Sequence, residues 1–124
     1  MKIFPAIDIK DKKCVRLIKG DFGNKTEYET SPIEQAAKYR DHGFKNLHIV
    51  DLDGALTGQT VNLDIIKEIV SKYDLKIEIG GGVRKTESIK QYIDAGAEKV
   101  ILGSGAIKNK EFLKDSCEKF KGQI

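Results

Sequence analysis

Two glycine-rich segments, each behind a short apolar run, have the composition of an anion-binding site. The first reads Ile-Gly-Gly-Gly-Val-Arg at residues 79–84, and the second reads Leu-Gly-Ser-Gly-Ala at residues 102–106. Glycine has no Cβ, so backbone N–H groups can approach a phosphate closely, and a helix that starts behind them adds partial positive charge. We expect the two segments to share one anion site; the alternative is a pair of tight turns with no ligand.

Asp8 is the first candidate for acid–base chemistry. It ends the apolar run Pro-Ala-Ile-Asp at residues 5–8. A carboxylate at the carboxyl end of a parallel strand lies where α/β folds place their chemistry, partly desolvated and able to accept or donate a proton. The alternative role is structural, with Asp8 capping the bend at residues 10–12.

The second apolar run carries further polar candidates, in the order Leu-His-Ile-Val-Asp-Leu-Asp at residues 47–53. Side chains alternate along a strand, so either the face of His48 or the face of Asp51 points to the interior, and periodicity leaves both open. A lone histidine on an apolar strand is often a hydrogen-bonded core residue. Asp51 and Asp53 can instead cap the turn around Gly54.

Arg16 and Arg84 are two of only three arginines in a lysine-rich chain. The planar guanidinium suits a bidentate grip on phosphate or carboxylate. Arg84 follows the glycine triplet almost directly, whereas Arg16 lies in a long segment after the first apolar run. Each is either a ligand contact or a solvated surface arginine.

These residues require an alternating framework of strands and helices. Apolar runs at residues 3–9, 47–52, 77–79 and 100–102 predict four buried parallel strands. Amphipathic segments between and after them predict four helices, the first opened by the capping box Ser31-Pro-Ile-Glu34. Strict alternation indicates an α/β fold with a parallel sheet, in a single domain over residues 1–124.

Two further segments refine this framework. Residues 10–30 form a long connection, within which residues 14–18 predict one short extra strand, and such a loop typically covers a site. Residues 121–124, Lys-Gly-Gln-Ile, resemble the end of a helix and the opening of a fifth strand. Four β-α units are half of an eight-unit TIM barrel, so we expect a (βα)4 half-barrel.

Composition excludes several classes of protein. The chain has 124 residues and a net charge of +3, with lysines scattered along it, which argues against a nucleic-acid partner. No apolar run has membrane-spanning or signal-peptide length, so we expect a cytoplasmic protein with no membrane partner. Cys14 and Cys117 lack metal-ligand spacing and are expected to be reduced thiols that fill apolar space. We expect neither a metal nor a cofactor.

Taken together in order and spacing, these motifs resemble one family, and the likeness runs from Met1 to the last residue. They are residues 5–8, 15–17, 19–21, 47–55, 79–84 and 102–106. The chain resembles the N-terminal half of the HisA family, the phosphoribosylformimino-5-aminoimidazole carboxamide ribotide isomerases of histidine biosynthesis. Such an enzyme is an aldose–ketose isomerase: it carries out an Amadori rearrangement in which an aminoaldose (ProFAR) opens its ring and becomes an aminoketose (PRFAR).

The resemblance assigns roles to individual residues. It implies that Asp8 accepts the proton from C2′ of the sugar, and that a partner carboxylate lies just beyond Ile124 at the end of the fifth strand. It implies that one substrate phosphate is held by Gly81, Gly82, Gly103 and Ser104, and that Arg16, His48 and Arg84 contact the substrate. The family usually has Thr-Ala where this chain has Ser104-Gly105, and serine keeps the hydroxyl.

Other functions compete with this hypothesis. A half-barrel that binds phosphate but is inactive alone is the first, because the second carboxylate and second phosphate site belong to the other half. The sister cyclase, imidazole glycerol phosphate synthase, carries Cys-Leu-Asp where residues 6–8 read Ala-Ile-Asp. A receiver-type signalling domain needs paired acids after its first strand. We expect self-association or pairing with a C-terminal half-barrel, since a half-barrel has open strand edges.

Overall fold

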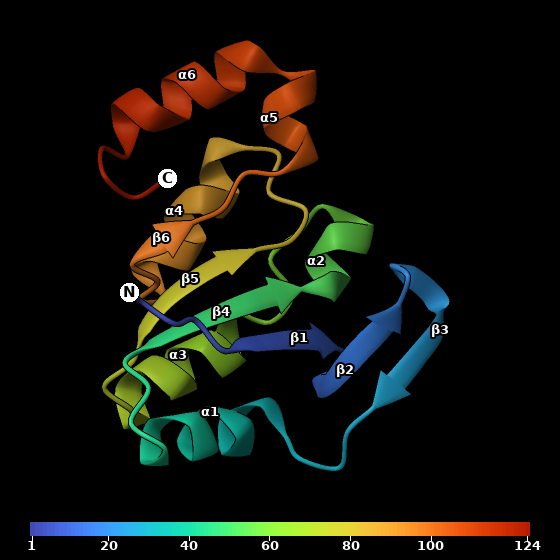
Figure 1. Cartoon of the computed structure of the whole chain (residues 1–124). Helices are drawn as coiled ribbons and strands as arrows, with labels where there is room; N and C mark the ends of the chain where they lie inside the picture. The colour runs from blue at the N-terminus through green and yellow to red at the C-terminus, as the bar shows by residue number, and fades with distance from the viewer.

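The computed structural model describes residues 1–124 as one sheet of six strands with six helices (Figure 1). The strands are β1 (Ala6–Lys10), β2 (Lys13–Ile18), β3 (Asp21–Glu27), β4 (Asn46–Asp51), β5 (Lys76–Gly80) and β6 (Lys99–Val100). The helices are α1 (Pro32–Asp41), α2 (Leu52–Thr57), α3 (Leu63–Lys72), α4 (Thr86–Asp94), α5 (Ser104–Lys108) and α6 (Lys110–Lys119). The strand order across the sheet is β3-β2-β1-β4-β5-β6.

Four of the strands form the parallel sheet that the sequence predicts. β1 pairs with β4, β4 with β5 and β5 with β6, all parallel, so each new β-α unit adds its strand beside the previous one. This is the arrangement of half of a (βα)8 barrel and confirms the α/β half-barrel prediction. The first strand is shorter than expected: it begins at Ala6, and residues 3–5 are not part of it.

The segment after β1 is a β-hairpin, which corrects the prediction of a loop with a single extra strand. β2 pairs antiparallel with both β1 and β3, so the sheet gains two strands at the β1 edge. The sequence signal for β3 is weak because this strand is almost wholly exposed and has no apolar face; its residues are Asp-Phe-Gly-Asn-Lys-Thr-Glu. The ion pair of Glu27 with Lys13 joins the two strands, and Lys25 pairs with Glu27 within β3.

The sequence pattern also fails to predict two short helices. α2 and α5 follow β4 and the β6 segment, and each is shorter than two turns. Helices of this length have too few residues to show an apolar stripe. By contrast, the capping box of α1 is confirmed: Ser31 Oγ accepts from the N–H of Glu34, while Glu34 Oε2 accepts from the N–H of Ser31.

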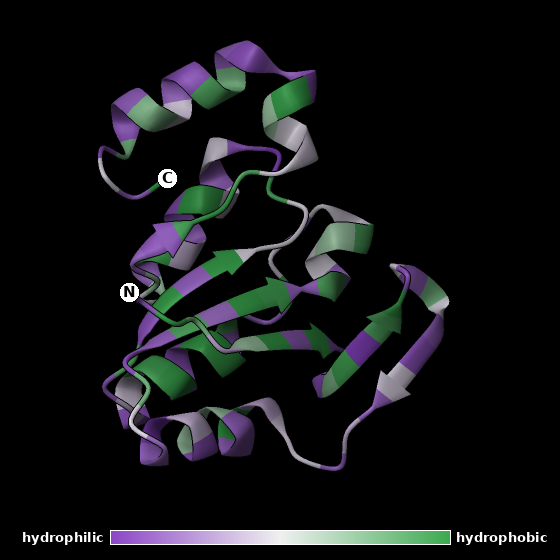
Figure 2. Cartoon of the chain, viewed as in Figure 1, coloured by the Kyte–Doolittle hydropathy of each residue, from purple (hydrophilic) through white to green (hydrophobic).

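The hydrophobic core lies between one face of the parallel sheet and its helices. Ile7 and Ile9 of β1, Leu47 and Ile49 of β4, and the helical residue Ile66 are at most 3% exposed. Hydrophobic stretches run along β1, β4 and β5 in Figure 2, while much of the outer surface of α6 is hydrophilic. Each fully buried large aliphatic side chain stabilises the fold by about 1.5–3 kcal/mol. No helix combines the length and apolar character that crossing a membrane requires.

The end of the chain runs beside β6. The backbone N–H of Val100 donates to the carbonyl oxygen of Gln123 over 2.8 Å, and Ile124 packs on the core. Residues 121–124 form no assigned strand. A fifth strand next to β6, predicted from the sequence, stays a prediction.

A buried carboxyl group joins β4 to three helices. Asp51 is 0% exposed and caps α2 by accepting from the N–H of Gly54 over 2.8 Å. Its side chain also accepts from Asn62 Nδ2 over 2.8 Å and from the hydroxyl of Tyr92 over 3.0 Å. Burial and the neighbouring carboxyl group of Asp51 both raise the pKa of the Tyr92 phenol, so it stays a donor. Of the two sequence interpretations of Asp51, the capping role is confirmed.

We expect Tyr92→Phe to lower the free energy of unfolding by about 1–3 kcal/mol, because it leaves a buried carboxyl oxygen short of a donor. Urea denaturation followed by circular dichroism measures this. Tyr39→Phe is the matched control: the Tyr39 hydroxyl donates to Ala6 O over 3.4 Å in an exposed setting, so its loss changes stability by less than about 0.5 kcal/mol. Equal effects in the two variants would contradict the role of Tyr92.

Candidate functional site

The sheet has one face covered by helices and one open face, and the polar candidates divide between them. Along β4 the burial alternates, with Leu47, Ile49 and Asp51 buried and the intervening residues half-buried. His48 therefore lies on the open face, where its register partners are Ala6 on β1 and Glu78 on β5. The structure decides the choice that periodicity left open: His48 faces the inside of the half-barrel, and Asp51 faces the helices.

Six of the eight candidate residues line one cavity of about 260 Å³ at the carboxyl ends of β4, β5 and β6. They are His48, Gly81, Gly82, Arg84, Gly103 and Ser104. Val50, Gly80, Val83, Ile101 and Gly105 complete its wall. The two glycine-rich segments thus meet at one cavity, as their shared composition predicts, and the size suits a phosphate with part of the group that carries it.

The glycine triplet is required first by packing. Gly81 has φ +125°, and a Cβ built on it would lie 2.2 Å from the carbonyl oxygen of Asp51. Gly82 has φ +68°, and its Cβ would lie 1.8 Å from the carbonyl oxygen of Gly54. No side chain fits at either position. The turn after β5 therefore packs directly against the backbone of the turn between β4 and α2. This part of the cavity wall consists of backbone without side chains.

The remaining contacts of this cavity are polar. Arg84 donates from Nη2 to the carbonyl oxygen of Ala55 over 3.3 Å, which anchors the exposed guanidinium beside the cavity. Ser104 is exposed at the first position of α5. The helix expected directly behind the triplet begins only at Thr86, and residues 83–85 form the link. The partial positive charge of the helix N-terminus, expected directly behind the glycines, therefore lies about one helical turn further along the chain.

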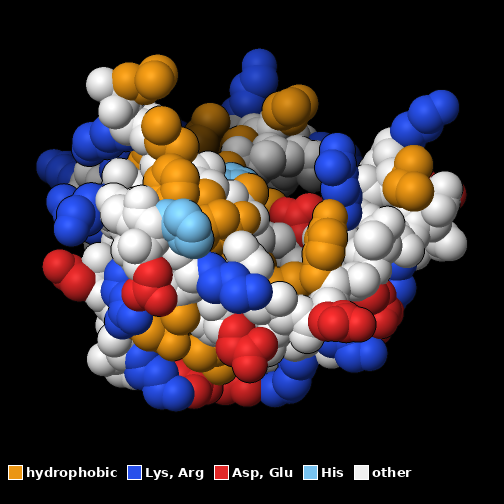
Figure 3. All heavy atoms as spheres, turned by 60° about the horizontal axis from the view of Figure 1, so that its bottom comes forward, with side chains coloured by type: hydrophobic (Ala, Val, Ile, Leu, Met, Phe, Trp, Pro, Cys, Tyr) orange, Lys and Arg blue, Asp and Glu red, His pale blue; other side chains and the backbone are white.

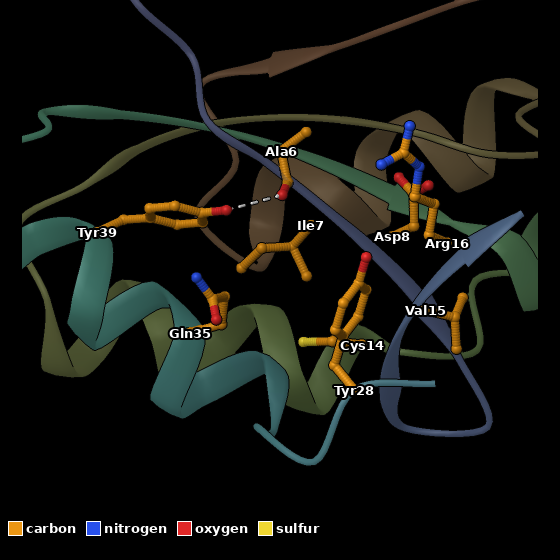
Figure 4. Close-up of a pocket in the computed structure, with 9 residues that line it drawn as sticks. All are labelled: Ala6, Ile7, Asp8, Cys14, Val15, Arg16, Tyr28, Gln35 and Tyr39. Carbon is orange, nitrogen blue, oxygen red and sulfur yellow. Dashed lines mark hydrogen bonds between the residues drawn. The ribbon is translucent and has the colours of Figure 1, made fainter. Parts of the chain in front are cut away.

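Asp8 and Arg16 line a second and larger cavity, of about 450 Å³, beside β1 and β2. β1, β2, Tyr28 and α1 enclose it, and Figure 4 shows Asp8 and Arg16 near each other at one end of it. At the other end, Gln35 and Tyr39 of α1 project towards β1. The eight candidates therefore form two groups, and both groups contain residues from the open face.

The carboxyl group of Asp8 is half-buried and has a perturbed proton affinity. Burial raises its pKa from the ordinary value of 3.8, and the nearby His48 partly offsets this. A carboxylate that holds its proton more tightly than usual is a stronger base once ionised. Asp8 is the one carboxyl group in the chain with a raised pKa among those that clearly shift, which distinguishes it from surface acids.

Asp53 shows the opposite behaviour and belongs to the scaffold. It accepts from Lys10 Nζ over 3.0 Å, from the N–H of Asp11 over 3.0 Å and from Asn62 Nδ2 over 3.0 Å. Burial alone would raise its pKa, but these donors outweigh burial and lower it. Asp53 thus ties the β1 turn to the start of α3.

The prediction that both cysteines fill apolar space is confirmed for Cys14, which also lines the larger cavity, and is wrong for Cys117, which is exposed. Cys14 is buried in the core, where burial raises its thiol pKa to about 11, and Cys117 is exposed and free. No group of three or more His, Cys, Asp or Glu side chains is arranged to hold a metal ion.

Sequence reasoning missed Glu78, Asn62 and Tyr92. Glu78 lies between two buried isoleucines in β5. Because side chains alternate along a strand, Glu78 lies on the open face once the isoleucines are known to face the helices. Asn62 and Tyr92 reach Asp51 from 11 and 41 residues away in the chain, a proximity that no local pattern carries.

We expect Gly82→Ala to destabilise the chain by more than about 2 kcal/mol, because it combines a left-handed φ with a backbone clash. Gly103→Ala is the control from the same cavity, since no atom lies within 4 Å of its added Cβ. Thermal unfolding of both variants measures the difference. Similar melting temperatures for the two would contradict the close approach of the turns.

The two perturbed carboxyl groups predict stability changes of opposite sign. The raised pKa of Asp8 means that its ionisation costs stability as pH rises from the unfolded pKa through the folded pKa. We therefore expect Asp8→Asn to raise the free energy of unfolding at pH 7, by less than about 1 kcal/mol after solvent screening. The gain should shrink towards pH 3, where the carboxyl group is protonated in both states.

Asp53→Asn serves as the counterpart. The hydrogen bonds that lower the pKa of Asp53 stabilise the folded state. This stabilisation is present above the pKa of the unfolded state and is lost as pH falls through the pKa of the folded state. We expect this variant to lose about 1 kcal/mol at pH 7. Urea unfolding at pH 3 and pH 7 compares the pair, and a loss of stability in Asp8→Asn at pH 7 would contradict the desolvation of Asp8.

Comparison with known proteins adds an independent line of evidence. A family model described as "Histidine biosynthesis protein" matches residues 2–124. Three relatives share the name 1-(5-phosphoribosyl)-5-((5-phosphoribosylamino)methylideneamino)imidazole-4-carboxamide isomerase. The one from Pelagibacter ubique (strain HTCC1062) is 80% identical over 124 residues, which are 100% of this chain and 52% of the relative.

The other two relatives are more distant. The protein of Chlorobaculum tepidum is 46% identical over 121 residues, covering 98% of this chain and 46% of the relative. The protein of Halothermothrix orenii is 45% identical over 120 residues, covering 97% and 51%. The chain spans about half the length of the curated relatives it matches.

Proposed function

Because the chain belongs to the histidine biosynthesis protein family, we propose that it is the N-terminal half of a phosphoribosyl aminoaldose isomerase. The reaction is the Amadori rearrangement of the substrate named in its relatives, ProFAR, to the aminoketose PRFAR. The observation that carries the proposal is the half-buried carboxyl group of Asp8, with its raised pKa, beside His48 and the glycine cavity on one open sheet face. An acid–base group and an anion site together match a phosphorylated sugar.

In this proposal Asp8 is the base. Ring opening breaks the C1′–O4′ bond and places a proton on O4′. Asp8 then takes the proton from C2′, which gives an enolamine, and C1′ gains a proton while the C2′ hydroxyl loses its own, which leaves the carbonyl at C2′. A desolvated carboxylate suits the second step, since general-base catalysis typically contributes about 10²–10⁴-fold.

The glycine cavity holds one phosphate in this proposal. Gly81, Gly82 and Gly103 offer backbone without side chains, Ser104 offers a hydroxyl, and Arg84 offers charge. Arg16 lies with Asp8 at the other cavity and contacts the substrate from the hairpin side. No metal or cofactor enters the reaction, and the cytoplasmic location stays a prediction.

The acid that protonates O4′ and the site for the second phosphate belong to a C-terminal half, which we propose as the partner. Three observations support the pairing. The open sheet face carries the candidate residues, β6 is the last strand of the parallel sheet, and Met1, Ile3 and Phe4 expose apolar side chains. Figure 3, which turns the bottom of Figure 1 towards the viewer, shows hydrophobic side chains gathered beside a hollow. Closing the barrel would cover this apolar surface.

Self-association of this chain would cover the same surface and is the alternative occupant. The second candidate function is phosphate binding without catalysis, favoured by the glycine cavity, which this chain forms from its own residues. The names of the relatives favour the isomerase over the sister cyclase, and the family match removes the receiver-type hypothesis.

A chimera tests the proposal. This chain replaces the matched half of the Pelagibacter ubique relative, and the product is assayed for conversion of ProFAR. We expect activity with native Asp8 and a loss of about 10²-fold or more in kcat with Asp8→Asn, because the base is removed.

Asp94→Asn is the control, since that carboxylate is exposed on α4 and pairs only with Lys90. It should retain full activity. Activity that does not depend on Asp8 would overturn the catalytic role. An inactive chimera that still binds phosphate would favour the second candidate function, and adding the two halves as separate chains tests whether they pair without a covalent link.

A further inference from the structure

A histidine and a glutamate meet on the open face of the sheet. His48 on β4 and Glu78 on β5 are register partners in the parallel ladder, so their side chains point to the same side. Nδ1 of His48 lies 2.8 Å from Oε1 of Glu78. The two side chains are 29% and 27% exposed, so water screens the contact only in part.

The contacts of Glu78 allow only one position for the imidazole proton of His48. Glu78 forms no ion pair with a lysine or arginine, although Lys99 is its register partner on β6. An ionised carboxylate only accepts hydrogen bonds, so Nδ1 of His48 must carry the proton. The neutral imidazole then has its lone pair on Nε2. A carboxylate that orients an imidazole in this way is a common device in protein sites.

We propose that Glu78 is a positioning residue that holds the His48 proton on Nδ1 and so leaves Nε2 free to accept a hydrogen bond from the ligand. His48 lines the glycine cavity, where phosphate oxygens only accept. The group that Nε2 matches is therefore a hydroxyl of the sugar next to the phosphate. The identity of that ligand rests on the proposed function, whereas the tautomer does not.

Nitrogen NMR tests the tautomer directly on the 124-residue chain. The sequence has only two histidines, His42 and His48. Nδ1 of His42 lies 2.7 Å from the carbonyl oxygen of Lys38, which only accepts, so His42 is an internal reference with its proton on Nδ1. Long-range ¹H–¹⁵N spectra above the titration range should show both histidines with the proton on Nδ1.

Glu78→Gln is the informative variant. A glutamine amide can donate or accept, so it no longer imposes one tautomer, and we expect His48 alone to gain the form with the proton on Nε2. Glu87→Gln, at an exposed position of α4, should leave both histidines unchanged. A wild-type His48 with its proton on Nε2 overturns the proposal even where the variant does not fold, and an unchanged tautomer in folded Glu78→Gln overturns it as well.

A second readout uses the chimera described above. Glu78→Gln should raise KM about three- to tenfold, because the loss of one hydrogen bond to the substrate has an effect of this size. The effect on kcat should be smaller. A shifted tautomer with an unchanged KM would overturn the hydroxyl contact. A chimera that is inactive with every native residue in place would count against the proposed function, while the NMR result would still decide the role of Glu78.

Discussion

The convergence of donors on the buried carboxyl group of Asp51 holds the functional end of the sheet together. Gly54, Asn62 and Tyr92 all donate to it, which joins the end of β4 to α2, to the start of α3 and to α4. The glycine triplet lies on the backbone of this same turn, at distances that exclude a Cβ. The wall of the glycine cavity therefore rests on a hydrogen-bond network whose central carboxyl group lies on the other face of the sheet.

The two faces of the parallel sheet divide stability from chemistry. The covered face carries Ile, Leu and the fully hydrogen-bonded Asp51, and it supplies most of the buried apolar area. The open face carries Asp8, His48 and Glu78, and His48 offsets only part of the effect of burial on the pKa of Asp8. A desolvated carboxylate reduces stability at neutral pH, and this cost is typical of a functional group held ready for proton transfer.

The hairpin changes the meaning of the long segment after β1. As strands β2 and β3, residues 13–27 extend the sheet and bring Arg16 and Tyr28 to the cavity that contains Asp8. The segment therefore contributes an ordered wall. The ion pair of Lys13 with Glu27 joins β2 to β3, whose side chains are almost wholly exposed. The larger cavity is thus lined in part by residues of this segment, whereas the glycine cavity lies at the ends of β4, β5 and β6.

The order of apolar runs and glycine-rich segments by itself determined the α/β class, the four parallel strands, the capping of α1 and the glycine-rich composition of the candidate site. These properties are local, since periodicity, caps and glycine act within a few residues. The tertiary structure alone decided that His48 and not Asp51 faces the open side, because alternation has two equivalent phases until helices cover one face. It also decided the grouping of Asp8 with Arg16, the exposed hairpin, and the contacts of Glu78, Asn62 and Tyr92. Those depend on strand register and on residues far apart in the chain, which no local pattern of residue types records.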